Sequence, residues 1–386
     1  MVRCRAVRIL IDYRAALRQR TGVGEFVHEL TRALAVDPDL IARGDDLAIL
    51  TTSYKDRPPP ELAAQLPGIA IIDRRVPVRP LTWVWNRLGW PPVEWLTGAV
   101  DVVHAQTPLL IPAREAAQVI TIHDLDFLRH PERTHGEMRR DFPTRVRAHA
   151  RRADHIVVSS HYAANEVIAE LGVLPNCVTI CSPGTPGWST AVASARDNGV
   201  SGSTILFLGT VEARKNVYGL LEAYALVRAR RPDAPPLVIA GRLTPASQPL
   251  IQRATKPPLA NCVEFRGYVP DTERAALYRQ ARMLVLPSFE EGFGLPVLEA
   301  MACGVPVVVS NRGSLPEVAG DAARPVAPDD VEALAGEMER LLDAKSACDA
   351  AARGLAQARR YTWAKCAASA LHAYREAVTV HRTRRQ

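Results

Sequence analysis

Short runs of β-branched and other apolar residues alternate along the whole chain with stretches whose apolar residues recur at helical spacing. The runs are continuous rather than interrupted by polar residues, which is typical of strands buried on both faces of a sheet. This succession predicts an α/β fold with parallel, doubly wound sheets. In the first half the expected strands are residues 7–12, 47–52, 69–74, 101–106, 119–124 and 155–160, with helices at 25–35 and 161–172.

The pattern restarts after residues 183–203, a segment rich in Pro, Gly, Ser and Thr that is typical of an inter-domain linker. A chain of 386 residues is long enough for two domains that each bury a core. We expect Rossmann-like domains at 1–190 and 200–360, and a last helix within 361–386 that packs back on the first domain. The second-half strands are expected at 204–210, 237–241, 263–269, 283–288 and 305–310, with helices at 216–231, 272–281, 331–344 and 362–378.

The seven cysteines are odd in number and scattered, and only Cys177 and Cys181 lie close together. Neither they nor the histidines have the spacing of a zinc site, and such cysteine usage suits a reducing cytosol. No segment reaches the ~18 uninterrupted apolar residues of a membrane span, and the N-terminus lacks the apolar core of a signal peptide. We therefore expect a cytoplasmic protein, with peripheral contact at the inner face of an anionic membrane left open.

A net charge of +7 is mild for this length and cannot distinguish nucleic acid from anionic lipid as a partner. No nucleic-acid-binding module is recognisable, so nucleic acid is not expected as a partner. The run Arg139–Arg152 holds six arginines and one acid, and it is either a solvated helix face or a patch facing phosphates. Four of the six tryptophans lie in residues 79–96, where they suit either an interface with membrane or sugar, or packing between helices.

The segment with the richest chemistry is 287–310, where an expected strand ends at a loop containing Gly294 and a second glycine. Pro296 then fits the first turn of a helix, whose free N–H groups favour an anion such as a diphosphate. Glu291 and Glu299 are eight positions apart. Since a carboxylate would repel a diphosphate, we expect both to contact neutral hydroxyls of a sugar and a ribose. The alternative is a generic strand–loop–helix corner with two surface glutamates.

This segment resembles the Glu-x7-Glu signature of the retaining GT-B glycosyltransferases of family 4. The resemblance extends over nearly the whole chain and is clearest from 204 to 345. It implies two Rossmann-like domains facing a central cleft, with the nucleotide-sugar donor on the C-terminal domain and the acceptor on the N-terminal one. It implies that Glu291 contacts the transferred sugar and Glu299 the ribose. The backbone of Phe293, Gly294 and Leu295 would cap the diphosphate and the sugar hydroxyls.

Gly209 ends an expected strand, and Arg214 and Lys215 follow at the start of the next helix. A guanidinium beside an ammonium suits a diphosphate, although such a pair is also common on solvated surfaces. The resemblance implies that the two cations neutralise the leaving nucleoside diphosphate in place of a metal. Neither a metal nor any other cofactor is therefore expected.

In residues 266–278, Asp271 or Thr272 can cap the expected helix. The loop before it contains Tyr268 and Val269, whose backbone could hydrogen-bond the edge of a base. The resemblance implies that this loop meets the base of the nucleotide.

In the first half, Gly22 and Gly24 lie at the start of an expected helix. They are either a turn that needs positive φ or, by the resemblance, a glycine loop that faces the donor phosphates. Glu25 stands where the family usually has a basic residue, which puts a side-chain contact there in doubt.

His123 ends the strand expected at 119–124. The resemblance implies that it points at the transferred sugar, and the segment from His123 to Glu132 is similar to mannosyl-transferring members of the family. Asp126 and His130 are weaker candidates for a site.

We therefore expect a metal-independent enzyme that transfers a hexose with retention, with His123, Arg214, Lys215 and Glu291 as catalytic residues. Mannose from GDP-mannose is the first candidate donor, and UDP-linked sugars remain open. The expected acceptor is a saccharide or polyprenyl-linked saccharide in surface polysaccharide or lipopolysaccharide biosynthesis. Closure of the cleft would exclude water from the donor. The alternatives are a GT-B nucleotide-sugar epimerase and a catalytically silent nucleotide-sugar-binding subunit.

Overall fold

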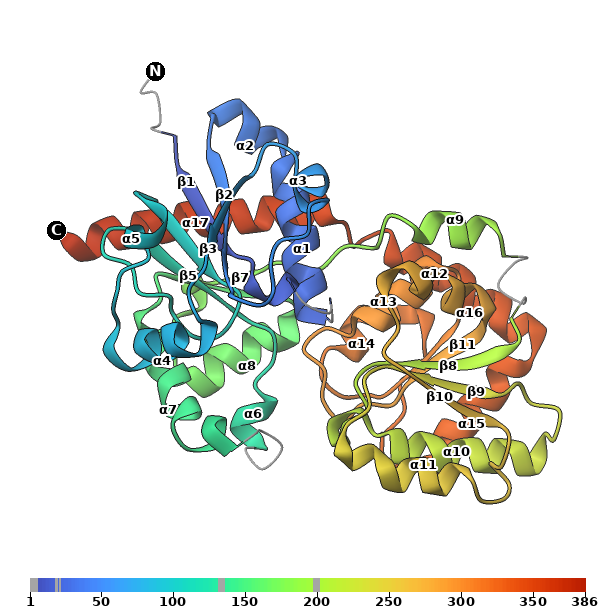
Figure 1. Cartoon of the computed structure of the whole chain (residues 1–386). Coiled ribbons are helices and arrows are strands. Elements are labelled where there is room, and N and C mark those ends of the chain that lie inside the picture. Colours follow the sequence, from blue (N-terminus) through green and yellow to red (C-terminus); the bar gives the residue numbers. More distant parts are fainter. Residues whose placement is uncertain (1–5, 18–19, 21, 131–135, 197–201) are drawn as a thin grey trace. The chain divides into compact units, whose positions relative to one another are not determined.

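The computed structural model describes residues 6–17, 20, 22–130, 136–196 and 202–386. The chain divides into two compact units (Figure 1). The first unit comprises Met1–Gly184 and Thr362–Gln386, and the second comprises Thr185–Tyr361.

The described part of the first unit contains a parallel sheet of seven strands in the order β3-β2-β1-β4-β5-β6-β7. Six of these strands lie where the sequence predicts them, because long apolar runs mark strands with both faces covered. The seventh, β7, was not predicted, since three residues carry too little periodicity. The strands are β1 Arg8–Asp12, β2 Asp46–Thr52, β3 Ala70–Arg74, β4 Val102–Ala105, β5 Ala117–Ile122, β6 His155–Val158 and β7 Val178–Ile180.

Helices cover both faces of this sheet. On one face, α1 (Gly22–Ala35) and α17 (Trp363–Arg385) lie side by side over a core that includes Ile9, Ile11 and Val119. On the other face, α4, α7 and α8 pack over the alternate strand residues, as expected for a pleated sheet. The remaining bounds are η1 Arg14–Ala16, α2 Pro38–Arg43, α3 Leu62–Gln65, α4 Val78–Leu88, α5 Glu94–Thr97, α6 Asp126–Arg129, α7 Gly136–Arg152, α8 His161–Leu171 and η3 Pro175–Cys177.

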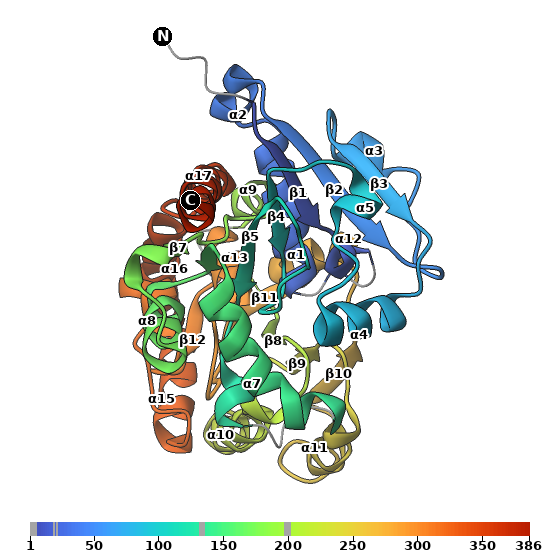
Figure 2. The ribbon, with the colours of Figure 1, turned by 90° about the vertical axis from the view of Figure 1, so that its left-hand side faces the viewer.

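The last helix, α17, is part of the first unit although it follows the second in sequence; Figure 2 shows it nearly end-on. Tyr374 Oη forms a hydrogen bond with His104 Nδ1 on β4 at 2.8 Å. Near the end of the helix, Arg384 Nη1 and His381 Nδ1 lie 3.1 and 3.0 Å from the carboxylate of Asp154. The helix is thus held to the sheet by apolar packing along its length and by an ion-pair cluster at its end.

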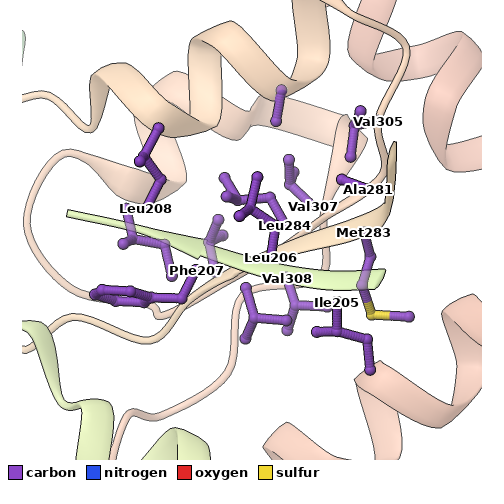
Figure 3. Packing of buried hydrophobic residues seen from close by; sticks show 14 of the residues in the cluster. Ile205, Leu206, Phe207, Leu208, Ala281, Met283, Leu284, Val305, Val307 and Val308 are labelled. Atoms are coloured by element: carbon purple, nitrogen blue, oxygen red, sulfur yellow. The ribbon is translucent and has the colours of Figure 1, made fainter. Parts of the chain in front are cut away.

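The second unit contains a parallel sheet of five strands among its described residues, in the order β10-β9-β8-β11-β12. Figure 3 shows the core around β8, where Leu206 and Leu208 lie on one side of the strand and Ile205 and Phe207 on the other. The strands are β8 Thr204–Leu208, β9 Leu237–Ala240, β10 Val263–Gly267, β11 Ala281–Leu286 and β12 Val307–Val309.

The helices of the second unit follow these strands. The order β10-β9-β8-β11-β12 places the loops after β8 and β11 next to each other, because neighbouring parallel strands end at the same edge. The helices are η4 Ala213–Lys215, α10 Val217–Arg230, η5 Pro245–Ser247, α11 Gln248–Ala254, α12 Asp271–Gln280, α13 Leu295–Ala302, α14 Leu315–Ala319, η6 Gly320–Ala322, α15 Val331–Leu342 and α16 Ala344–Ala358.

The segment 183–203 differs from the expected linker without periodicity. It contains a short helix, α9 (Ser189–Ser194), and the described residues from 185 onward belong to the second unit. The ring of Trp188 stacks on that of Tyr278 with centroids 5.8 Å apart, and Arg196 Nη1 donates to Tyr278 O at 2.8 Å. Proline and glycine content indicated a loop but could not reveal these packing contacts.

Candidate active site

Lys215 and Glu291 form a buried ion pair at the carboxyl edge of the second unit's sheet. Lys215 follows β8 on η4, and Glu291 lies in the loop after β11. Lys215 Nζ donates a hydrogen bond to Glu291 Oε1, and Arg214 Nη1 lies 3.4 Å from Oε2. A backbone bond from Phe289 N to Arg214 O, 2.8 Å long, joins the two loops. Two segments 76 residues apart therefore form one charged cluster.

Opposite charges within this cluster offset the cost of removing each charged side chain from water. Lys215 is 7% exposed and Glu291 is 5% exposed. Burial opposes ionisation of Glu291, but Lys215, Arg214 and a hydrogen bond from Ser288 Oγ at 2.7 Å outweigh it and hold the pKa of Glu291 below its usual value. Burial lowers the pKa of Lys215, and Glu291 partly offsets that effect. The two side chains therefore stabilise each other's ionised forms against the effect of burial.

The structure excludes one alternative for these residues and adds a contact that the sequence did not predict. Arg214 and Lys215 are not a solvated surface pair, because Lys215 is buried. Glu291 does not stand apart from the cations but contacts both of them. The physical reason is that a buried carboxylate needs a counter-charge, and these are the cations within reach. Arg214 has a further carboxylate neighbour, Glu212, whose Oε1 lies 2.7 Å from Arg214 Nε.

The backbone of Glu291 is held by the loop after β12. Ser314 donates to Glu291 O from both its N–H and its hydroxyl, each at 3.0 Å. Gly313 has φ of +60°, and a Cβ there would lie 2.6 Å from Glu291 O. Sequence reasoning missed this loop. Its signal was a Gly-Ser pair just after a strand end, next to the sheet's carboxyl edge.

Glu299, on α13, belongs to a second buried cluster. Arg274 Nη1 donates to its Oε1 at 2.8 Å, and Tyr278 Oη donates to its Oε2 at 2.7 Å. Burial raises the pKa of Glu299, and Arg274 and Tyr278 oppose that rise. Each carboxylate oxygen has two lone pairs, so each can still accept one hydrogen bond from a ligand. The sequence did not identify Arg274 or Tyr278, although their i, i+4 spacing places them on one face of α12.

The start of α12 differs from the sequence-based prediction. Asp271 and Thr272 do not cap the helix, because the N-cap is Pro270 and no side chain caps it. Asp271 is the first helical residue, and its Oδ1 lies 3.2 Å from Arg274 Nη2. Tyr268 and Val269 lie between β10 and α12, with Val269 buried and Tyr268 half-buried.

The glycine-rich positions of the second unit lie beside these clusters. A Cβ at Gly209 would lie 3.7 Å from Lys215 Cε, so the backbone after β8 runs along the lysine side chain. Gly294 is the N-cap of α13 with φ of +88°, which favours glycine. Phe293 is buried, with its ring 5.7 Å from that of Tyr361, and Leu295 begins the helix. The sequence therefore correctly placed a glycine at the entry to this helix.

In the first unit, helix α1, which begins with the two glycines, contacts His123. Gly22 and Gly24 begin α1, and Gly24 does not have positive φ, so the turn interpretation is wrong at that position. Gly24 is needed for close packing instead, since a Cβ there would lie 2.7 Å from Ala15 O. Two residues on, the Phe26 ring meets that of His123 edge-to-face with centroids 5.2 Å apart.

His123 is held in its neutral form. Its Nε2 atom is buried and has no hydrogen-bond partner among the described residues. Burial lowers the pKa of His123 to about 4, and Asp124 opposes that effect. An unpartnered buried nitrogen is uncommon in a native structure, so Nε2 has a hydrogen-bonding capacity that the described residues leave unused.

Comparisons with known proteins show the family to which this chain belongs. The family model for glycosyl transferases group 1 matches residues 197–357, and that for glycosyltransferase family 4 matches residues 20–187. The chain is 34% identical over 284 residues to the O-antigen chain mannosyltransferase B of Escherichia coli, covering 71% of this chain and 74% of that protein. The chain belongs to the group 1, family 4 glycosyltransferases.

Two further proteins are similar to this glycosyltransferase. The serotype-specific mannosyltransferase WbdA of Escherichia coli is 34% identical over 269 residues, which are 66% of this chain but only 33% of that longer protein. The solved structure of sucrose-phosphate synthase from Thermosynechococcus elongatus superposes with a TM-score of 0.72 at 20% identity, covering 96% of this chain and 98% of that one. The fold is therefore GT-B, with two Rossmann-like parallel-sheet domains.

The remaining candidate residues of the first unit are Asp126 and His130. Asp126 begins α6 and is buried, and its backbone carbonyl accepts a bond from His130 N at 2.7 Å. Pro131 and Glu132 lie outside the described residues. No group of three or more His, Cys, Asp or Glu side chains that could hold a metal occurs in the described part of the chain.

The sequence left open whether the tryptophans of residues 79–96 pack between helices or lie at an interface, and the structure divides them between core and surface. Trp85 is core, since it is 3% exposed and donates from Nε1 to Pro91 O at 2.9 Å. Trp83, Trp90 and Trp95 are exposed. Of the arginine run on α7, the side chains of Arg139 and Arg140 lie outside the described part, whereas Arg147, Arg151 and Arg152 are exposed. Within the described chain, no helix combines the length and apolarity needed to cross a membrane.

Proposed function

We propose that this glycosyltransferase transfers a hexose with retention from a nucleotide-sugar, with GDP-mannose as the first candidate donor. The acceptor would be a saccharide or a polyprenyl-linked saccharide of a bacterial surface polysaccharide of the O-antigen type. The similarity to two mannosyltransferases, one named for the O-antigen chain, supports both choices.

The observation that carries the proposal is the buried cluster of Arg214, Lys215 and Glu291. Its cations lie at the carboxyl edge of a parallel sheet, where ligands of such folds bind. A diphosphate entering here would replace Glu291 as the partner of the two cations. The released carboxylate could then accept hydrogen bonds from hydroxyls of the transferred sugar, as the sequence analysis expects.

The roles of the remaining residues follow from this placement. Glu299 would accept from the ribose hydroxyls, and Tyr268 and Val269 would meet the base. The backbone of Gly209 and of Phe293–Leu295 would approach the phosphates. In the first unit, His123 Nε2 would contact the transferred sugar, with Gly22 and Gly24 facing the donor.

Charge neutralisation by Arg214 and Lys215 supports a reaction without a metal. As the bond between sugar and diphosphate breaks, negative charge develops on the departing phosphate oxygen, and two fixed cations stabilise that charge. On this scheme the departing diphosphate takes the proton of the acceptor hydroxyl on the same face of the sugar, so that the configuration is retained. The site would operate at the cytoplasmic face of the membrane.

Thermal stabilisation by GDP, UDP and dTDP, each with and without EDTA, tests the donor site. A ligand that binds only the folded state raises the melting temperature according to its affinity. We expect GDP to give the largest shift and EDTA to leave it unchanged. No shift with any nucleotide would contradict the proposed donor site, and a shift that EDTA removes would contradict the metal-free scheme.

The epimerase alternative is tested on the sugar rather than on the nucleotide. Incubation with GDP-mannose alone should leave the sugar configuration unchanged when the product is examined by NMR. Appearance of an epimer without any acceptor would identify an epimerase instead.

A further inference from the structure

Three aromatic rings, those of His123, Phe26 and Trp363, form a continuous series of contacts in the first unit. The Phe26 ring meets the His123 imidazole edge-to-face, with centroids 5.2 Å apart and an interplanar angle of 84°. The indole of Trp363 packs on Phe26 at a tilt of 55°, with centroids 6.0 Å apart. Phe26 is 2% exposed and Trp363 is 9% exposed. Because interiors are close-packed, a displacement of Trp363 is transmitted to Phe26 and from there to His123.

Trp363 lies where the chain returns to the first unit from the second. It is the first residue of α17, and the N-cap residue Thr362 accepts a hydrogen bond from Lys365 N at 3.2 Å. Gly184, at the end of the unit's first segment, packs against the indole. A Cβ at Gly184 would lie 2.7 Å from Trp363 Cδ1, so a larger residue would force a shift. The indole is therefore fixed between the start of α17 and the Gly184 backbone.

Hydrogen bonding does not account for a tryptophan at this position. The Nε1 atom of Trp363 is buried and has no hydrogen-bond partner among the described residues. A buried indole N–H usually finds an acceptor, and leaving it without one costs free energy. An apolar side chain would avoid that cost. The shape of the indole, rather than its polarity, is therefore what this position uses, and Phe26 is the ring against which that shape packs.

The orientation of the His123 ring depends on its packing. Its Nε2 atom is also buried without a hydrogen-bond partner in the part of the chain that the structure describes, so no hydrogen bond there fixes the ring. The edge-to-face contact with Phe26 limits how the imidazole can turn. A misplacement of about 1 Å at a reacting group can cost about 100-fold in rate. Residues that hold His123 in place therefore matter wherever His123 does.

We infer that Trp363 is a positioning residue of the glycosyltransferase, which holds His123 against the transferred sugar through Phe26. The inference rests on the proposed function, in which His123 Nε2 contacts that sugar. Trp363 itself touches no substrate in this scheme and transfers no proton. Its substitution should therefore lower turnover, whereas the nucleotide site of the second unit should bind as before.

The imidazole resonances of the full chain report the position of His123 without any donor or acceptor. The Hε1–Cε1 correlation of His123 is assigned by its loss in His123→Gln. In Trp363→Leu this correlation should move, because Phe26 is no longer held and its ring current at the imidazole changes. The pKa of His123 should rise from about 4 toward 6.5, since a looser ring is less buried. Asp124 and His104, the titratable groups whose charges interact with His123, are unaltered in this variant.

Transfer kinetics test whether this position matters for the reaction. Trp363→Leu should lower kcat by about ten-fold, because the imidazole is displaced from the sugar. The KM for the donor and the thermal shift with GDP should stay near those of the unaltered chain. Trp363→Phe keeps an aromatic ring against Phe26, so it should recover most of kcat and move the His123 correlation less.

A double variant separates action through Phe26 from direct action. Phe26→Leu alone should move the His123 correlation and lower kcat at least as much as Trp363→Leu does. Phe26→Leu combined with Trp363→Leu should lose no more turnover than Phe26→Leu alone, because the indole acts only through that ring. Losses that multiply would show that Trp363 acts by another route.

Two control variants distinguish positioning from a general loosening of the fold. Trp85 is another buried tryptophan of the first unit, in the core on the opposite face of the sheet. Trp85→Leu should lower the melting temperature comparably but leave the His123 correlation and kcat unchanged. Tyr361, two residues before Trp363, packs on Phe293 in the second unit. Tyr361→Leu alters the same connection and should also leave the His123 correlation unchanged.

An unmoved His123 correlation in Trp363→Leu would overturn the inference, as would an equal movement in Trp85→Leu or Tyr361→Leu. If Trp363→Leu does not fold, an unmoved correlation in Trp363→Phe overturns it instead. The assignment variant His123→Gln separates this inference from the proposed function. Normal transfer by His123→Gln would contradict the contact between His123 and the sugar, whereas an unmoved correlation contradicts only the action of Trp363.

Discussion

Lys215 and Glu291 form a buried ion pair that joins the loops after two neighbouring parallel strands, β8 and β11. The pair occupies the position where the proposed mechanism places the donor's diphosphate. Glu291 is thus the counter-ion of Lys215 and, in the proposed mechanism, a ligand of the transferred sugar when the donor is bound.

Lys215→Met should reduce transfer by about 100-fold or more, because a cation that stabilises the developing phosphate charge is lost. It should also destabilise the second unit by about 3 kcal/mol, since buried Glu291 loses the cation that hydrogen-bonds it and keeps only the more distant Arg214 as a counter-charge. The double variant Lys215→Met with Glu291→Gln should regain most of the stability but none of the activity. Denaturant unfolding and a transfer assay measure the two effects separately.

The exposed Lys256 provides a matched control, since Lys256→Met should change neither stability nor activity. Activity close to normal in Lys215→Met would exclude the proposed diphosphate site. Failure of the double variant to regain stability would show that the pair is not the source of the loss.

Gly313→Ala should lower kcat by about ten-fold or more, because the added Cβ meets the Glu291 carbonyl and shifts the backbone that carries this carboxylate. Gly44→Ala is the control, since Gly44 has φ of +69° but open space around its Cβ position. Both variants suffer the strain of positive φ, and only the first should affect turnover. Equal loss of turnover in the two would mean that Gly313 does not act through Glu291.

Tyr278→Phe should raise the KM for the donor by about five- to ten-fold with little change in kcat. The variant loses one hydrogen bond to Glu299, worth about 1–1.5 kcal/mol, at a carboxylate assigned to the ribose rather than to the reacting bond. Tyr224→Phe is the matched control. This buried tyrosine donates a hydrogen bond of 2.8 Å to Pro235 O, and that bond involves neither cluster. A fall in kcat at unchanged KM would argue against the ribose assignment of Glu299.

Acidification should destabilise the first unit and spare the second. All ten histidines lie in the first unit, and burial lowers the pKa of His104 to about 3 and those of four others to about 4. An unfolded histidine titrates near 6.5, so below that pH the unfolded chain binds more protons and stability falls as pH falls. Each fully buried histidine should lower the free energy of unfolding by about 2 kcal/mol as the pH falls from 6.5 to 5. The four others are His28, His123, His149 and His155.

Scanning calorimetry at pH 7.5 and 5, with hydrogen exchange to assign the transitions, checks this asymmetry. His104→Gln keeps an amide that can bond Thr121 or Tyr374, and it should reduce the pH dependence. Equal destabilisation of both units would contradict the assignment to buried histidines.

The sequence predicted the strands well because each is a continuous apolar run between turn residues. It failed where the signal is short or weak. The three residues of β7 show no period, and α16 buries mainly alanines and so lacks a marked apolar pattern. Helix α9 lies in a segment whose composition is that of a loop.

The candidate site was predictable where chemistry and spacing coincide in one segment, as at Glu291 and Glu299. The ion pair between Glu291 and Lys215 was not, because it depends on which strands are neighbours. Arg274, Tyr278 and Gly313 were missed for the same reason: each acts on a glutamate from a different loop or helix. Pairing across a sheet edge is a property of the fold rather than of any local sequence pattern.

In the proposed mechanism, the Lys215–Glu291 cluster binds the diphosphate of the nucleotide-sugar donor without a metal. The most direct measurement is incorporation of radiolabelled mannose from GDP-mannose into a panel of polyprenyl-linked saccharides, with excess EDTA. We expect the unaltered enzyme to incorporate mannose whether or not EDTA is present, and Lys215→Met to incorporate about 100-fold less or lower still. Incorporation that EDTA abolishes, or that Lys215→Met retains in full, would contradict this mechanism.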